Sequence, residues 1–332
     1  MTTARVTVVT VTYGRRWHLL RRVIEACLSE QPNVAALVVV DNGSQDDIPQ
    51  KLSLFASERL ILVSHGENTG SANGFKTGLK AAMERTDSEF IWLLDDDNIP
   101  SPDSLNRLLL AHASLGNDTD IALLSLRPAM RNRWKLSTLG GDFVRRVRNN
   151  AFAGFHIADV PRRIAIRLSA KRTEIPPLIE CGFAPYGGLF LHRSVLGRAG
   201  FPDERLFLYG DDLEFTLRLR KLNIRIFLCA TSIVEDAEGH WHDQLGSFCP
   251  HLSRNAQEFR VYYLIRNSTF VEKRYGVTIK GLYLVNMAVY LSLGVFVNLL
   301  RERSPVMVYR RLLLVARAIR DGWNERLGRH AF

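Results

Sequence analysis

The chain has 332 residues, 46% of them hydrophobic, and a formal net charge of +10. This length allows one large domain or two smaller ones, and the hydrophobic share excludes a largely disordered chain. The cysteines, Cys27, Cys181, Cys229 and Cys249, are too widely spaced for a CxxC pair or a dense disulfide framework. We therefore expect buried thiols in a reducing compartment.

Positive charge is concentrated in two segments. Residues 127–172 contain twelve Lys or Arg against Asp142 and Asp159, and residues 301–329 contain eight arginines. Such segments are compatible with nucleic acid, anionic lipid or polyanionic substrates, or form an ordinary solvated face.

The first 126 residues alternate strand and helix patterns. Apolar runs predict strands at 5–12, 36–41, 60–64, 90–94 and 121–126, and amphipathic runs predict helices at 18–30, 73–84 and 102–115. This alternation predicts an α/β fold with a mostly parallel sheet and helices on both faces. Because a strand pattern begins at residue 5 without a cationic leader and hydrophobic signal segment, we expect a cytoplasmic protein.

Three aspartates, Asp95, Asp96 and Asp97, follow the buried-strand pattern 90–94. Ligands bind at the carboxyl ends of strands in open α/β sheets, and adjacent carboxylates repel unless a positive charge neutralises them. A divalent cation carrying a phosphorylated substrate would supply that charge. The alternative is a solvated acidic turn, which Asn98 and the two nearby prolines favour.

Two other predicted strands end in polar residues. Thr12 and Tyr13 close the first strand, and Asp41 closes the second. All these strand ends meet at one sheet edge, where a nucleotide can bridge them. Singly, Asp41 is equally well explained as a turn acid and Tyr13 as a half-buried aromatic.

The segment 68–78 comes close to a P-loop but has Phe75 where glycine is required. A bulky residue there obstructs the backbone wrap around phosphate, so we reject a P-loop. We expect the segment, with Asn68, Gly70 and Lys76, to pass close to a nucleoside at a helix N-terminus. A Gly-rich loop entering a helix is the structural alternative.

The second half begins with a basic, irregular segment, 127–178, which suits an insertion or acceptor-side loops. Regular patterns return with a strand at 187–191, a helix from Arg193, a helix through Arg220 and a strand at 224–229. Asp211 and Asp212 precede that second helix. Helix capping explains one acid well, whereas a carboxylate facing the first acid cluster can take a proton from an attacking hydroxyl.

The run 235–243 offers a third set of polar side chains. A neutral imidazole of His240 or His242 can complete a metal site with Asp97, and their alternating spacing lets only one face the site. A solvent-exposed histidine is the commoner outcome for any single position.

The chain becomes helical from Glu258 onward. Residues 281–300 carry no charge and are long enough to span a bilayer, but Asn286, Ser292 and Asn298 would need partners in lipid. We favour a helix packed on the domain or lying in the membrane interface over a true span.

In order along the chain, VTVVTVTYGRR, VVVDNGS, NTGSANGFKTGL and FIWLLDDDNIPSPDSL resemble the motifs of inverting family 2 glycosyltransferases with the GT-A fold. FPDERLFLYGDDLEFTLRL extends the resemblance, which then covers about residues 5–245. The variant with DNGS, NTGSANG and DDD is more similar to galactofuranosyl- and rhamnosyltransferases than to cellulose-synthase-like members.

This resemblance implies roles for individual residues. Asp97 would bind Mn²⁺ or Mg²⁺ bridging the diphosphate, Asp212 would be the catalytic base, and Asp211 its acidic neighbour near the acceptor. The donor-nucleotide contacts implied by these motifs are Thr12, Tyr13, Arg16, Asp41, Asn68, Gly70, Lys76, Asp95 and Asp96.

The chain departs from the family at the third metal ligand. Where the family often has a histidine, this chain has Glu235 and Asp236, so either His240 or His242 substitutes, as we favour, or Asp236 binds the metal.

The resemblance also implies a UDP- or dTDP-sugar donor and a lipid-linked or cell-surface glycan acceptor, as in polysaccharide or O-antigen synthesis. We expect a catalytic domain at 1–250, with 127–178 as an insertion, and a helical, basic C-terminal region at 251–332 on the inner face of the cell membrane. We expect galactofuranose first and rhamnose second as the transferred sugar. The sequence is compatible with both a monomer and a homo-oligomer.

Two other functions are compatible with parts of the sequence. A sugar nucleotidyltransferase on a similar scaffold would release pyrophosphate. A basic nucleic-acid-binding protein would leave the acid clusters unexplained, so we expect no nucleic-acid partner.

Overall fold

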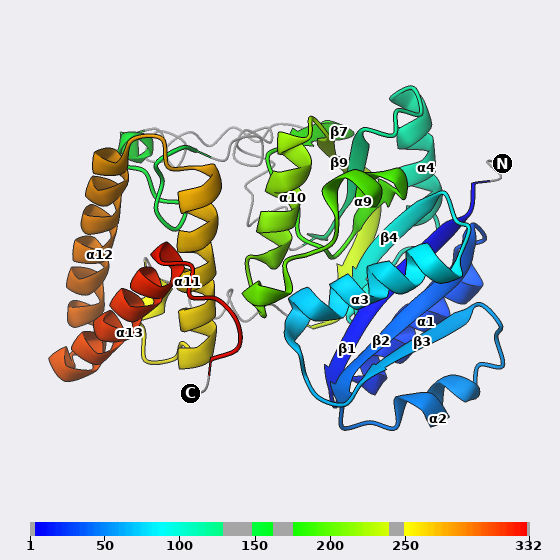
Figure 1. The fold of residues 1–332 in the computed structure, drawn as a ribbon, viewed down its shortest axis with the longest axis horizontal. Helices are drawn as coiled ribbons and strands as arrows, with labels where there is room; N and C mark the ends of the chain where they lie inside the picture. Colours follow the sequence, from blue (N-terminus) through cyan, green and yellow to red (C-terminus); the bar gives the residue numbers. More distant parts are fainter. Residues whose placement is uncertain (1–3, 129–147, 162–174, 239–248, 331–332) are drawn as a thin grey trace. The chain divides into compact units, whose positions relative to one another are not determined.

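The computed structural model describes residues 4–128, 148–161, 175–238 and 249–330, which belong to two compact units (Figure 1). The N-terminal unit comprises 1–146, 171–204 and 212–238, and the C-terminal unit comprises 147–170, 205–211 and 239–332. Each unit therefore draws on separate stretches of the chain.

A nine-stranded sheet forms the centre of the N-terminal unit. Its strands are β1 (Val6–Gly14), β2 (Val34–Ser44), β3 (Leu60–His65), β4 (Phe90–Asp95), β5 (Asn98–Pro100), β6 (Ile121–Leu126), β7 (Leu178–Cys181), β8 (Leu189–His192) and β9 (Arg225–Asp236). The order is β3-β2-β1-β4-β8-β6-β9-β5, with β7 also paired to β9. Strands β1 to β4 pair in parallel, as do β6 and β9, whereas β8 is antiparallel to both β4 and β6.

Both faces of this sheet are covered by helices, which confirms the predicted α/β architecture (Figure 1). On β1, Val9 and Val11 face a core shared with α3 (Gly70–Arg85), α9 (Ser194–Ala199) and α10 (Asp211–Lys221). Val6 and Val8 face the opposite core, shared with α1 (Trp17–Glu30), α2 (Ile48–Ser53) and α4 (Ser104–Ser114). The β-branched run of β1 suits a strand whose alternate side chains are buried on both faces.

The C-terminal unit is helical. It contains α11 (Glu258–Tyr275), α12 (Lys280–Glu302) and α13 (Pro305–Trp323), around a core rich in aromatic side chains. Short 3₁₀ helices occur at Ile157–Asp159 and Pro250–Leu252 in this unit. A third, Glu204–Leu206, begins with the last residue of an N-terminal-unit stretch and continues into the C-terminal unit.

Within this unit, Asn267 of α11 holds the segment that leads to Asp211. Its amide donates to the carbonyl oxygens of Leu206, Leu208 and Tyr209 at 2.7 to 2.9 Å. Gly210 has φ +77° and lies directly against the Asn267 side chain, so a side chain at 210 would be strained and crowded.

Among the described residues, α12 alone is long and apolar enough to cross a membrane. Its most apolar window has a mean hydropathy of 1.8, and 28% of that window is buried.

Candidate active site

The polar residues of the candidate site gather at one edge of the sheet. β1, β4, β6 and β9 all end at this edge because they run in the same direction. β8 runs the opposite way, so Gly187 and Gly188 enter the sheet here, between the ends of β4 and β6. This is the edge at which open α/β sheets bind ligands.

Asp96 is buried in a network with the first strand and its loop. Its carboxylate accepts a hydrogen bond from Thr12 Oγ1 at 2.8 Å, and the single Arg16 Nε–H is shared between its two oxygens at 2.9 Å each. Burial raises the pKa of Asp96 above its ordinary value, while the Arg16 and Thr12 contacts act in the opposite direction. Thr12, Arg16 and Asp96, which the sequence motifs assign to one site, are thus in direct contact.

Arg16 links three acids. Besides Asp96, it lies 3.4 Å from Asp97 Oδ2 and 2.5 Å from Glu238 Oε2. Burial opposes its charge, but the hydrogen bond to Asp96 and the surrounding carboxylates together hold the pKa of Arg16 above its ordinary value. Its guanidinium also packs 5.5 Å from the ring centre of the half-exposed Tyr13.

Asp97 lies among like charges. Burial, followed by the charges of Asp95 and Asp96, raises the pKa of Asp97 to about 7. Asn98 donates to Asp97 Oδ1 at 3.3 Å, and the Asp97 carbonyl accepts from Ala237 N at 2.9 Å. The Asp97 carboxylate therefore sits in a site whose electrostatics favour binding a cation.

Arg127 and Asn98 are site residues that the sequence reasoning missed. Arg127 Nη1 lies 3.3 Å from both Asp95 Oδ2 and Asp236 Oδ1, and Asn98 donates to Asp236 Oδ1 at 2.9 Å. Arg127 directly follows β6, so the strand-end rule that selected Asp95 would also have selected Arg127. Asp236, the alternative metal ligand, is thereby placed beside Asp97 and Asn98.

The side chains of Asp95, Asn98 and Arg127 lie close against the backbone of Gly187. A Cβ there would lie 2.6 Å from Asp95 Oδ2, 2.8 Å from Arg127 Nη1 and still closer to Asn98 Oδ1. A side chain at 187 would displace the ends of the Asn98, Asp95 and Arg127 side chains from the positions they hold in the site.

Asp212 stands in the first turn of α10, where its Oδ1 accepts from Leu213 N at 2.8 Å. Burial, opposed by that hydrogen bond and aided by the charge of Asp95, raises the pKa of Asp212 to about 6. The charge of Arg127 lowers this pKa. Asp212 therefore interacts electrostatically with both Asp95 and Arg127, which also contact each other. Asp211, the first residue of α10, is buried.

The other predicted nucleotide contacts form a second group around Asn42. Asp41 lies in β2, three residues before the strand ends at Ser44, and its carboxylate accepts a hydrogen bond from Ser44 N at 2.8 Å. Asn42 Nδ2 donates to Asn68 Oδ1 at 3.3 Å and to the Gly70 carbonyl at 3.1 Å. Gly70, with φ +84°, opens α3.

Lys76 takes part in neither group. It lies on α3 and pairs with Glu204 at 2.6 Å. His240 and His242 lie outside the described residues. In the part of the chain that is described, no group of three or more His, Cys, Asp or Glu is arranged to hold a metal ion without rearrangement.

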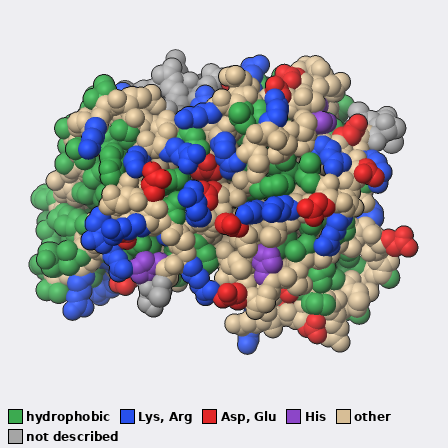
Figure 2. Space-filling view, in the orientation of Figure 1, with side chains coloured by type: hydrophobic (Ala, Val, Ile, Leu, Met, Phe, Trp, Pro, Cys, Tyr) green, Lys and Arg blue, Asp and Glu red, His purple; other side chains and the backbone are tan. Residues whose placement is uncertain are grey.

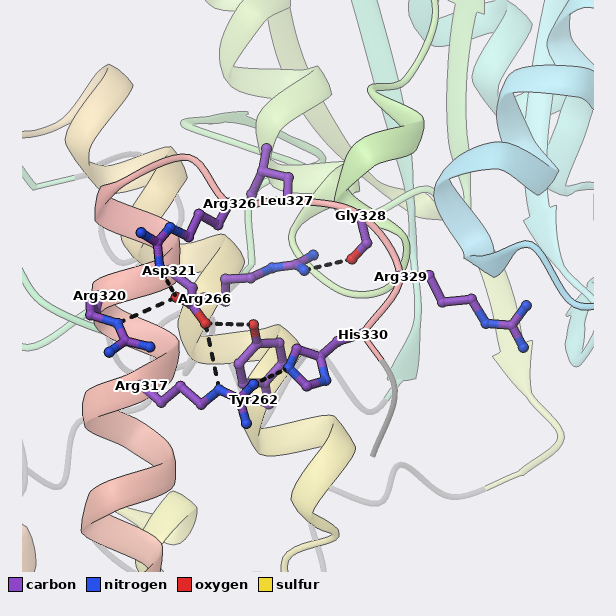
Figure 3. Close-up of a pocket in the computed structure, with 10 residues that line it drawn as sticks. All are labelled: Tyr262, Arg266, Arg317, Arg320, Asp321, Arg326, Leu327, Gly328, Arg329 and His330. Atoms are coloured by element: carbon purple, nitrogen blue, oxygen red, sulfur yellow. Dashed lines mark hydrogen bonds and ion pairs between the residues drawn. The ribbon is translucent and has the colours of Figure 1, made fainter.

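The C-terminal unit has a separate, basic pocket (Figure 3). Arg317, Arg320 and Arg326 lie 3.5 to 3.8 Å from the buried Asp321, which also accepts from Tyr262 Oη at 2.9 Å. The remaining lining residues are Arg266, Leu327, Gly328, Arg329 and His330. This pocket has the opposite charge balance from the sheet-edge site and contains none of the predicted catalytic residues.

Residues 7–170 match the family model described as Glycosyl transferase family 2. Residues 7–170 therefore form a family 2 glycosyltransferase domain with a GT-A fold, which identifies the chain as an enzyme. A sugar nucleotidyltransferase would not be expected to match this family.

Among characterised relatives, the chain is similar to the galactofuranosyltransferase GlfT1 of Mycolicibacterium smegmatis, at 27% identity over 70% of this chain and 71% of the relative. It is 28% identical to GlfT1 of Mycobacterium tuberculosis over 58% of this chain and 57% of that protein. The low-salt glycan biosynthesis hexosyltransferase Agl10 of Haloferax volcanii is 24% identical over 74% and 72% of the two chains.

Two solved structures share the fold. GalNAc-T7 with UDP, GalNAc and Mn²⁺ has a TM-score of 0.55 at 14% identity, covering 81% of this chain and 47% of that one. The mannosyltransferase PcManGT of Pyrobaculum calidifontis, in complex with GDP-Man and Mn²⁺, has a TM-score of 0.52 at 18% identity, covering 95% and 75%.

Proposed function

We propose that this enzyme is a metal-dependent, inverting galactofuranosyltransferase that uses UDP-galactofuranose and a lipid-linked or cell-surface glycan acceptor. The observation that carries the proposal is the pairing of the carboxylate cluster at the end of β4 with Asp212 on α10. The similarity to two galactofuranosyltransferases supports the sugar.

The residues at the sheet edge fit a divalent cation. Mn²⁺ and Mg²⁺ prefer oxygen ligands, and Asp97 and Asp236 present carboxylate oxygens close to one another. Burial first, and then the charges of Asp95, Asp96 and Asp236, raise the pKa of Asp97 against the opposing charge of Arg16, so a bound cation would relieve the repulsion among these carboxylates. Asp97 would hold the metal, with Asp236, His240 or His242 as a further ligand, and the bound ion would neutralise charge on the diphosphate.

Asp212 would act as the general base. Its pKa of about 6 leaves it largely ionised at neutral pH, yet basic enough to accept a proton from the acceptor hydroxyl. As the proton moves to Asp212, the hydroxyl oxygen forms a bond to the anomeric carbon. The bond from that carbon to the diphosphate oxygen breaks, and the departing UDP keeps the electron pair. Attack in line with the leaving group inverts the anomeric centre.

The donor nucleotide would lie along the other strand ends. Asp41 and Asn68 would contact the nucleoside, and Tyr13, which is 45% exposed, would pack against the base. Arg127 and Arg16, which contact Asp95 and Asp97, would supply positive charge to the diphosphate. The acceptor would be met at the inner face of the cell membrane, where a lipid-linked glycan is available.

A donor screen tests this proposal. The purified chain is incubated with UDP-galactofuranose, UDP-galactopyranose, UDP-glucose or dTDP-rhamnose, with Mn²⁺, Mg²⁺ or EDTA, and the release of UDP or dTDP is measured. We expect release from UDP-galactofuranose that needs the metal and rises with a lipid-linked acceptor. Release from dTDP-rhamnose alone would assign a rhamnosyltransferase, and full activity in EDTA would contradict the metal dependence.

A further inference from the structure

Helix α12 carries large apolar side chains on its solvent-facing side as well as on the side that packs against the aromatic core of the C-terminal unit. Its buried residues are Tyr283, Asn286, Tyr290, Gly294 and Asn298. Its large exposed residues are Leu284, Val285, Leu293, Phe296, Leu299 and Leu300, with Phe296 and Leu300 more than 60% exposed. A helix packed on one side of a water-soluble core would carry polar side chains on its outer side, so this exposed apolar face needs another partner.

The inward polar side chains are held by specific partners within the C-terminal unit. Asn286 accepts from Ile157 N at 2.9 Å and donates to the Asn150 carbonyl at 2.8 Å. Tyr283 Oη donates to Glu272 at 3.0 Å. These contacts fix the rotation of α12, because turning the helix would leave buried amides and carbonyls unpaired. The apolar face is thereby held outward.

The exposed apolar surface continues onto α13. Val306, Tyr309, Arg310, Leu313 and Arg317 are all exposed and follow one another at i, i+3, i+4, i+7 and i+11, so they share one helix face. This face mixes large apolar side chains with arginines, whose long stems can lie along an apolar surface while the charge reaches a polar one.

The charge around this surface has one dominant sign. Residues 280–323 contain seven basic side chains, Lys280, Arg301, Arg303, Arg310, Arg311, Arg317 and Arg320, and only two acids. Of the acids, Asp321 is buried, and Glu302 accepts a hydrogen bond from Ser253. Figure 2 shows the hydrophobic side chains gathered over α12 at the left edge of the view, with Lys and Arg beside them.

From these observations we infer that the outer face of α12 and the Val306 face of α13 form a docking surface for an anionic phospholipid bilayer. Apolar side chains would enter the boundary between headgroups and acyl chains, and the arginines would contact lipid phosphates. This surface identifies which part of the chain meets the membrane, and it does not depend on the identity of the donor sugar.

Two other occupants fit the surface less well. A second copy would bring two strongly basic surfaces together, and their repulsion opposes association. A span across the bilayer would carry Asn286 and Asn298, with the backbone carbonyls to which they donate, into hydrocarbon. We therefore assign α12 an orientation along the membrane surface.

Vesicle flotation of the full chain tests the assignment. Vesicles of phosphatidylcholine with 30% phosphatidylglycerol are compared with phosphatidylcholine alone. We expect the wild type to float with the anionic vesicles, and Phe296→Glu combined with Leu300→Glu to lower the partition coefficient at least about tenfold. Arg310→Glu should lower binding to the anionic vesicles only.

Leu54→Glu is the matched control, because Leu54 is 80% exposed but belongs to the N-terminal unit. It should float like the wild type. Circular dichroism and release of UDP from soluble donor confirm that each variant is folded, so loss of flotation with retained turnover separates this surface from the catalytic proposal.

Three results would overturn the inference. Equal flotation of the wild type and the Phe296/Leu300 variant would show that this face does not bind the membrane. Retention in the membrane after extraction at alkaline pH would indicate a span. A wild-type dimer that the double substitution converts to monomer, without vesicle binding in either protein, would assign the face to a second copy.

Discussion

The sheet-edge site and the arginine pocket contain the same types of charged group in opposite proportions. At the sheet edge, Asp95, Asp96, Asp97, Asp236 and Glu238 surround two arginines. The pocket is lined by five arginines, of which Arg317, Arg320 and Arg326 pair with Asp321, the one acid among the lining residues. The first arrangement has an excess of negative charge that a cation can neutralise, and the second has an excess of positive charge that an anion can neutralise.

The largest loss of activity is expected from a substitution at Asp212, which would show that the sheet-edge site, and not the arginine pocket, carries out catalysis. Replacing Asp212 with Asn removes the proposed base while keeping its size, so we expect turnover to fall about 10²- to 10⁴-fold. Donor binding should change little, because the replaced carboxylate faces the acceptor in the proposed reaction. Steady-state kinetics and calorimetric titration with UDP measure the two quantities.

Asp87→Asn is a suitable control for this variant, since Asp87 is an exposed acid of the same unit. Equal turnover in Asp212→Asn and Asp87→Asn would remove Asp212 from the catalytic role.

Asp96→Asn should mainly reduce stability. It replaces a buried acceptor of hydrogen bonds from Thr12 and Arg16, so we expect a loss of about 2–4 kcal/mol in the free energy of unfolding. Urea unfolding of the metal-free protein measures this loss. A variant as stable as the wild type would mean that Arg16 is satisfied by Asp97 and Glu238 alone.

Asp97→Asn should behave differently from its neighbour. In the metal-free wild type, the Asp97 pKa of about 7 lies above its ordinary value, so the folded state binds the proton more tightly than the unfolded state. Stability must then fall as pH rises from about 4 to 7, on the order of 2–3 kcal/mol. In EDTA, the variant should lose most of this pH dependence, and an unchanged slope would show that Asp97 is not strained by its neighbours.

Much of this site follows from one rule about the sequence. The apolar runs before Asp95, Asp41 and Thr12 predicted strands, and parallel strands bring their carboxyl ends to one edge. Gly187 could not be placed in the same way, because β8 is antiparallel and presents its beginning, not its end, at this edge. Arg127 directly follows a predicted strand, so the same rule could have selected it. Because it begins a basic, irregular segment, it was assigned to a loop instead.

The exposed apolar face of α12 was also beyond the sequence pattern alone. Asn286 and Asn298 were recognised as residues that need partners, but the partners, the Asn150 and Cys249 carbonyls, lie far away in the chain. Composition therefore predicted an apolar helix, whereas its orientation depends on tertiary hydrogen bonds.

The smallest expected effect belongs to Asp321 in the arginine pocket. Asp321→Asn keeps an acceptor for Tyr262 but removes the counter-charge for Arg317, Arg320 and Arg326, whose contacts at 3.5 to 3.8 Å are long and largely exposed. We expect a loss of about 1–2 kcal/mol at low salt, because the arginines then repel one another. Sulfate should restore most of the loss, since screening and anion binding replace the missing carboxylate. Melting temperatures with and without sulfate measure both effects, and equal melting of variant and wild type at low salt would show that the arginines do not need Asp321.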